Sequence, residues 1–153
     1  MTRSKARQLA LQISFATSSS EQDPSVLCDE MLTREYLDQL LEEDDLYKED
    51  PTKQSGYIKT LVCEVAAHKD ELDAVIEEYA SGWKLNRISA ITKEILRCAI
   101  AEILFIEDVP TKVAINEAVD LAKKYDDPEA ANFINGILGN YVRNNTELLN
   151  TDE

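Results

Sequence analysis

The sequence is poor in helix-breaking residues and in the groups that most often build catalytic or metal sites. Its 153 residues include four glycines, four prolines and a single histidine, His68. The three cysteines, Cys28, Cys63 and Cys98, are odd in number and widely spaced, which favours free thiols over disulfides or a zinc site. We therefore expect no metal centre and no cysteine–histidine nucleophile.

Long apolar runs and enzyme motifs are also missing. No run approaches the roughly 20 apolar residues that a membrane-spanning helix needs, and the amino terminus reads as an amphipathic stretch rather than a signal peptide. We therefore expect a cytoplasmic protein. The sequence contains no phosphate-binding loop, no dinucleotide-binding glycine motif and no zinc-protease or serine-hydrolase signature. These absences predict that the protein is not an enzyme and binds no cofactor.

What the sequence does contain is a helical pattern along almost its whole length. No stretch alternates apolar and polar residues with the period of a strand, so we expect an all-α fold of six to seven helices. The predicted helices cover residues 4–17, 25–46, 57–79, 91–106, 110–125 and 128–145. We expect one domain over residues 1–145, followed by a flexible polar tail over 146–153.

Two of these predicted helices carry packing signals. The segment 91–106 is apolar nearly all round, which predicts a central position in a bundle, with Ser89 as its cap. In the next helix, Ala114, Ala118 and Ala122 recur every four residues and predict a close approach of neighbouring helices.

The formal net charge of −14 argues against a polybasic nucleic-acid binder, but the charge is unevenly distributed. Residues 21–55 carry −9, whereas residues 1–20 carry +3 and residues 83–125 are close to neutral. At physiological salt, exposed charges more than about 8 Å apart hardly affect one another. A local anion site on the first helix therefore remains open.

That first helix combines charge with an aromatic side chain. Arg3, Lys5 and Arg7 lie at its amino terminus, where free N–H groups and the helix dipole favour phosphate, and Phe15 is a candidate for stacking on an unpaired base. The alternative is that the basic residues only solubilise the terminus and that Phe15 belongs to the core.

Several segments resemble the NusB family of transcription antitermination factors. They are WKLNRIS at 83–89, KEILR at 93–97 with Glu102, DVPTKVAINEAVDLAKKY at 108–125, FINGIL at 133–138 and the amino-terminal KAR at 5–7 with ALQ at 10–12. The resemblance covers roughly residues 3–17 and 57–143.

This resemblance implies a NusB-like fold of two packed three-helix halves and a role as an RNA-binding adaptor. Such proteins pair with the ribosomal protein NusE, hold single-stranded boxA elements of ribosomal RNA transcripts, and act indirectly on RNA polymerase with other Nus factors. By position, the resemblance assigns RNA contacts to Arg3, Lys5, Arg7, Phe15, Tyr125, Glu129 and Phe133. It assigns the NusE interface to Arg97 and Glu102.

The sequence departs from the family pattern at Thr92, where an acidic residue is common, and at Asp126, where glycine is usual. For Asn116, Asn135 and Gly136 we expect structural roles, as buried amides and as a site of close helix approach. Two alternatives stay open: a protein-interaction module with little RNA binding, and a NusB-like accessory domain of an RNA-modifying system.

Overall fold

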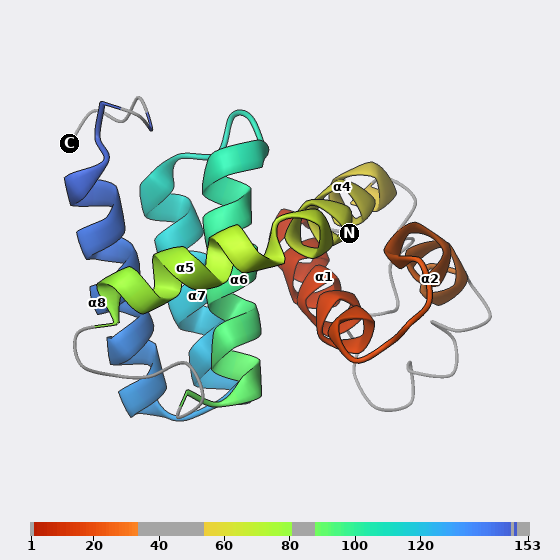
Figure 1. Ribbon diagram of the computed structural model, residues 1–153, viewed down its shortest axis with the longest axis horizontal. Coiled ribbons are helices and arrows are strands. Elements are labelled where there is room, and N and C mark those ends of the chain that lie inside the picture. Colours follow the sequence, from red (N-terminus) through yellow and green to blue (C-terminus); the bar gives the residue numbers. More distant parts are fainter. Residues whose placement is uncertain (1, 34–53, 81–87, 148, 150–153) are drawn as a thin grey trace. The chain divides into compact units, whose positions relative to one another are not determined.

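The computed structural model describes residues 2–33, 54–80, 88–147 and 149, and every regular element within these ranges is a helix (Figure 1). The helices are α1 (Arg3–Ser18), α2 (Pro24–Met31), α4 (Ser55–Ala67), α5 (Lys69–Tyr79), α6 (Ala90–Phe105), α7 (Thr111–Tyr125) and α8 (Pro128–Asn144). The all-α prediction is therefore confirmed. None of the described helices is long and apolar enough to cross a membrane.

The helices begin where the sequence provides caps. The Ser89 hydroxyl accepts a hydrogen bond from the Thr92 N–H at 3.2 Å and so starts α6. Asp127 accepts from the Ala130 N–H at 2.8 Å, and Pro128 occupies the first position of α8, where its missing N–H costs nothing. The predicted cap at Ser89 is therefore confirmed.

The chain forms two compact units, residues 1–67 and 68–153. In the first unit, α4 packs against both α1 and α2. In the second unit, α6, α7 and α8 lie side by side and α5 crosses them, packing against α6 and α8 (Figure 1). α6 contributes ten buried residues, which confirms its predicted central position.

The alanine repeat of α7 lies in the interior of the second unit. Ala114, Ala118 and Ala122 are each at most 2% exposed, and α7 packs against both α6 and α8. Small side chains bring helix backbones close together, so the predicted packing role is confirmed.

The predicted helix over 57–79 is wrong in one respect, because it is divided at His68. This residue has φ −116° and ψ 21°, and it separates α4 from α5. Its ring stacks on Phe105, with the ring centroids 4.5 Å apart. His68 therefore lies at the junction between two helices and not within a single one.

The predicted helix over 25–46 is also interrupted. α2 ends at Met31, and Leu32 closes it by donating its N–H to the Cys28 carbonyl. The Thr33 hydroxyl donates to the Glu30 carbonyl at 3.0 Å, so a side chain forms a hydrogen bond with a backbone carbonyl of the last turn. The rest of that predicted helix, from residue 34 on, lies outside the described residues, as do residue 148 and residues 150–153 of the expected tail.

Candidate functional site

The basic residues at the start of α1 are placed differently from one another. Arg3 is exposed; its Nε donates to Gln54 Oε1 at 2.9 Å and its Cζ lies 4.1 Å from the centroid of the Tyr57 ring. Lys5 is half-buried, whereas Arg7 is only 7% exposed. The structure therefore presents the charges of Arg3 and Lys5 at the surface and encloses most of Arg7.

The backbone adds to the positive character of this end of α1. The first turn contains no acidic residue, and Thr2 caps it by accepting from the Lys5 N–H at 3.2 Å. A helix amino terminus carries about half a positive elementary charge. With Arg3 and Lys5 beside it, this end attracts anions such as phosphate.

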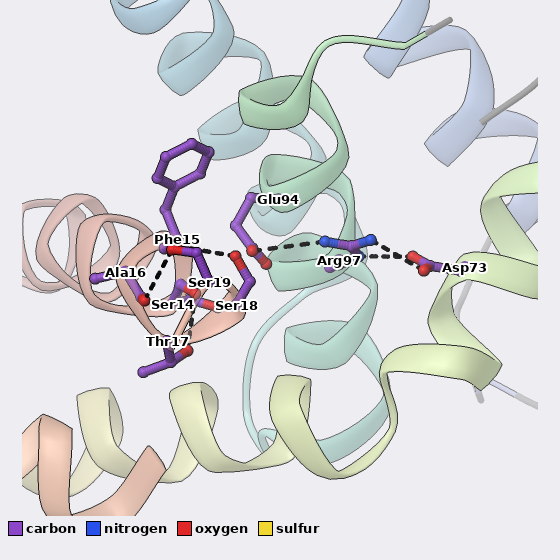
Figure 2. Close-up of polar contacts among 9 residues, drawn as sticks. All are labelled: Ser14, Phe15, Ala16, Thr17, Ser18, Ser19, Asp73, Glu94 and Arg97. Atoms are coloured by element: carbon purple, nitrogen blue, oxygen red, sulfur yellow. Dashed lines mark hydrogen bonds and ion pairs between the residues drawn. The ribbon is translucent and has the colours of Figure 1, made fainter. Parts of the chain in front are cut away.

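Phe15 lies on the surface near the other end of α1. Its side chain is 41% exposed, so the alternative that it belongs to the core is wrong. The hydroxyls around it are used within the helix: Thr17 Oγ1 donates to the Ser14 carbonyl and Ser18 Oγ to the Phe15 carbonyl, each at 2.8 Å (Figure 2). The exposed ring offers a flat apolar face of the kind on which an unpaired base stacks.

In the second unit, the three residues assigned to RNA by resemblance gather around the α7–α8 connection. Tyr125 is half-buried, with Lys124 Nζ 5.8 Å from its ring centroid. Glu129 is exposed and Phe133 is half-buried, and these two border a pocket of about 490 Å³. The pocket is lined by Ile88, Ser89, Thr92, Asp126, Asp127, Glu129, Ala130, Asn132 and Phe133. Tyr125 does not line it.

A carboxylate held by hydroxyl groups lies in this pocket. Asp126 Oδ2 accepts from Ser89 Oγ at 2.8 Å and from Thr92 Oγ1 at 2.7 Å, while Oδ1 accepts from the Asp127 N–H at 3.0 Å. The hydrogen bond from Thr92, followed by that from Ser89, lowers the pKa of Asp126 below its usual 3.8. The two departures from the family pattern, Thr92 and Asp126, are therefore direct hydrogen-bond partners, and the carboxylate is ionised at neutral pH.

The residues assigned to the NusE interface lie inside the second unit. Arg97, 9% exposed, makes a two-pronged pair with Asp73 of α5: Nε to Oδ1 at 2.6 Å and Nη2 to Oδ2 at 2.9 Å (Figure 2). Glu94 Oε1 lies 3.6 Å from Arg97 Nη1. Burial opposes the charge of Arg97, but Asp73 and Glu94 outweigh it and raise the pKa of the guanidinium. Glu102 is 3% exposed. Arg97 is thus placed to hold α6 against α5, and Glu102 is buried in the same unit.

Sequence reasoning misjudged the asparagines and the glycine of the signature. Asn116 and Asn135 are exposed rather than buried, and so is Gly136. A Cβ added at Gly136 would meet no atom of the described residues within 4 Å. A glycine inside a helix costs about 0.5–1 kcal/mol relative to alanine, and the described residues supply no packing reason for it. The sequence did contain a signal that Gly136 is exposed: it lies outside the apolar stripe of the helix, which contains Ile134 and Ile137.

The described residues contain no group of three histidine, cysteine, aspartate or glutamate side chains that could hold a metal ion. The cysteines Cys28, Cys63 and Cys98 are free thiols, as expected. Burial, followed by the nearby Cys63, raises the pKa of Cys28 to about 11. A thiol of this kind is a poor nucleophile at neutral pH.

A family model and individual known proteins both match this chain, and they point to the same family. The model of the NusB family matches residues 4–143. The transcription antitermination protein NusB of Symbiobacterium thermophilum is 38% identical over 154 aligned residues, covering 100% of this chain and 97% of that protein.

Two solved structures are similar over almost the whole chain. A structure of T. maritima NusB has a TM-score of 0.72 and 24% identity, covering 94% of this chain and 92% of that one. A structure of the antitermination factors NusB and NusE in complex with double-stranded RNA has a TM-score of 0.69 and 25% identity, covering 93% of this chain and 96% of the matched chain.

Proposed function

The chain belongs to the NusB family, and on that premise we propose that it is an RNA-binding adaptor in transcription antitermination that works together with NusE. The observation that carries the proposal is the family match over residues 4–143, together with the similarity to a NusB that was crystallised with NusE and RNA. We infer that its RNA is the single-stranded boxA type found in ribosomal RNA operons.

The first RNA contact in this proposal is the surface of α1. Arg3 and Lys5 provide cationic side chains beside a helix amino terminus without acidic residues, and Phe15 provides an exposed ring. Phosphates would be neutralised at the start of the helix and a base would stack on Phe15. Tyr125, next to Lys124, is the residue of the second unit that fits RNA best, because a ring and a cation lie together there.

The number of accessible cations limits the affinity of the chain for RNA. Each phosphate contact to a single strand contributes about −0.7 to the slope of log affinity against log salt. Three contacts would give roughly −2, and two contacts, since Arg7 is mostly enclosed, roughly −1.4. Because so few phosphate contacts contribute little to the affinity, tight RNA binding requires base stacking or a partner protein. We therefore propose that NusE raises the RNA affinity.

Fluorescence anisotropy of a labelled boxA oligonucleotide tests the proposal. We expect weak binding by the chain alone, and at least tenfold tighter binding when the cognate NusE is present at saturation. A scrambled oligonucleotide and a duplex of the boxA sequence serve as controls for sequence and for strandedness. An affinity that does not change when NusE is added would contradict the adaptor role.

A second candidate is a protein-interaction module with little RNA binding. The placement of Arg3 and Arg7 favours it, because Arg3 already contacts Tyr57 and Gln54 and Arg7 is mostly enclosed. The double variant Arg3→Ala/Lys5→Ala separates the two candidates. Loss of RNA binding with NusE binding retained supports the adaptor, whereas RNA binding that is absent in both the parent and the variant supports the module.

The remaining parts of the proposal concern organisation. We infer that residues 1–145 act as one domain, with a polar tail at 146–153, in the cytoplasm where transcripts are made. Arg97 and Glu102 act on NusE by fixing the position of α6, and RNA polymerase is reached through the assembled complex. No catalytic step and no cofactor are part of this role.

A further inference from the structure

We propose that Tyr57 of α4 and Gln54, the residue just before α4, are positioning residues that hold the Arg3 guanidinium in place for an RNA phosphate. In this arrangement both residues act through Arg3 and not by touching RNA. The three residues lie in the same compact unit, residues 1–67. The inference rests on the proposed function, because it gives the start of α4 a part in the RNA contact made by α1.

Two contacts fix the guanidinium of Arg3. Its Nε donates to Gln54 Oε1 at 2.9 Å, and its Cζ lies 4.1 Å from the centroid of the Tyr57 ring. The first contact holds an edge of the planar group and the second holds its face, so together they set both its position and its orientation. Neither contact uses Nη1 or Nη2, whose N–H donors match two oxygens of a phosphate.

The Tyr57 ring belongs to a well-anchored helix. α4 packs against α1, and its residues Ile58 and Leu61 are at most 1% exposed. Tyr57 is half-buried, and its hydroxyl oxygen is almost inaccessible to solvent. Arg3, in contrast, is exposed. A ring that is fixed by the packing of its own helix therefore restricts the movement of the arginine that lies on it.

Restricting Arg3 before RNA arrives favours binding. An arginine side chain has many rotamers, and a side chain that is already fixed in the free protein loses less entropy when it contacts a ligand. Gln54 and Tyr57 are uncharged, so they fix the guanidinium without cancelling its charge. A carboxylate in place of Gln54 would neutralise it, as Asp73 does for Arg97. The neutral pair is therefore suited to an arginine that binds an anion.

This arrangement is specific for arginine at position 3. A lysine carries the same charge but has no planar group to lie on the Tyr57 ring, and it cannot offer a fixed pair of donors to two phosphate oxygens. Arg3→Lys should therefore keep the salt slope of RNA binding and still bind boxA about threefold more weakly than the parent.

The first experiment measures the affinity of the full chain for labelled boxA RNA by fluorescence anisotropy, with the cognate NusE at saturation. Tyr57→Leu removes the ring, and we expect about threefold weaker binding. Tyr57→Phe keeps the ring and should restore the parental affinity. In an Arg3→Ala background, Tyr57→Leu should have no further effect, because it acts only through Arg3. A purely structural role would weaken binding equally in both backgrounds.

The second experiment changes Gln54, which tests the same inference without altering the apolar packing of α4. Gln54→Ala removes the acceptor, and we expect about twofold weaker boxA binding with an unchanged salt slope. Gln54→Glu places a carboxylate against Arg3, and we expect the slope to fall by about 0.7, as in Arg3→Ala. Gln22→Ala is the matched control, because Gln22 is an exposed glutamine of the same unit that also forms a side-chain hydrogen bond, to Glu30. It should bind boxA as the parent does.

The outcomes separate this inference from the adaptor role itself. If Tyr57→Leu binds boxA as well as the parent or more tightly, the contacts of Arg3 do not prepare it for RNA, and the inference is overturned while the adaptor role stands. Equal losses in the two backgrounds, or an unchanged slope in Gln54→Glu, overturn it in the same way. If the parent chain with NusE does not bind boxA, the adaptor role and the inference both fail.

Discussion

α1 and α6 are both helices of 16 residues, but they use arginine in opposite ways. On α6, Arg97 is enclosed and bound by two carboxylates, Asp73 and Glu94. On α1, Arg3 is exposed and contacts the Gln54 amide and the ring of Tyr57, and neither of these groups neutralises its positive charge. An arginine paired with carboxylates stabilises the packing of its own unit, whereas one held by neutral groups keeps a charge that attracts anions.

The largest effect is expected when Asp73, the carboxylate partner of Arg97, is removed. Asp73→Ala leaves an enclosed guanidinium without its two-pronged partner, and we expect a loss of about 3 kcal/mol in the free energy of unfolding. Urea denaturation monitored by circular dichroism measures it. Asp70→Ala, an exposed aspartate on the same helix, is the control and should lose less than about 0.5 kcal/mol. Equal losses in the two variants would show that the ion pair contributes little.

The exposed aromatic residue of α1 gives the next largest effect. Phe15→Ala should weaken boxA binding about tenfold, because stacking of one base on an aromatic ring contributes about 1–3 kcal/mol. The thermal stability should hardly change, since the ring is well exposed. Val26→Ala, at an exposed apolar residue of α2 in the same unit, is the control for RNA binding. If the two variants bind boxA equally well, Phe15 does not contact RNA.

A smaller effect on RNA binding is expected when Arg3, the exposed arginine of α1, is replaced. Arg3→Ala should reduce the salt slope of RNA binding by about 0.7 and lower the affinity a few-fold, because one phosphate contact is lost. The loss of its contact with Tyr57 should cost at most about 1 kcal/mol of stability. Arg3→Lys keeps the charge and should restore the slope. Titration of RNA at several salt concentrations measures the slope, and an unchanged slope in Arg3→Ala would assign Arg3 to the fold.

The smallest expected effect concerns the carboxylate of Asp126, which links the α7–α8 connection to the start of α6. Because Thr92 and Ser89 donate to it, the folded pKa of Asp126 lies below its usual 3.8, so its stabilisation is complete above about pH 5 and disappears as the pH falls through the folded value. The parent should exceed Asp126→Asn in stability by less than about 1 kcal/mol at pH 7, since the group is partly exposed. Thermal melts from pH 7 to pH 3 should show this difference shrinking below pH 4. A difference that grows on acidification would contradict the assigned direction.

Local pattern was sufficient to predict most of the helices. The caps Ser89 and Asp127 and the apolar periodicity of α6 are properties of neighbouring residues, so they can be read directly. The division at His68 was missed because the apolar stripe resumes in register after it, at Leu72. The signal was the interval from Val65 to Leu72, where His68 and Lys69 occupy positions that a continuous stripe would give to apolar residues.

The site was harder to predict because its contacts join distant parts of the sequence. Ser89 and Thr92 lie 37 and 34 residues from Asp126, and no local pattern indicates that their hydroxyls bind its carboxylate. Phe15 could be proposed as a stacking residue, but whether it was exposed depended on the packing of α1. The burial of Arg7 could not be predicted from the sequence either, because a charged residue near a helix terminus is usually exposed.

The connection between α7 and α8 is short, with Asp126 closing one helix and Asp127 capping the next. Short surface loops often tolerate insertions, but tolerance depends on the hydrogen bonds of the affected backbone and side chains. Here one carboxylate also fixes the first turn of α6 through Ser89 and Thr92. An inserted residue would shift Asp126 away from both hydroxyls or displace the cap of α8. This turn is therefore a point at which loop length is constrained, and a fusion tag or an inserted peptide belongs elsewhere in the chain.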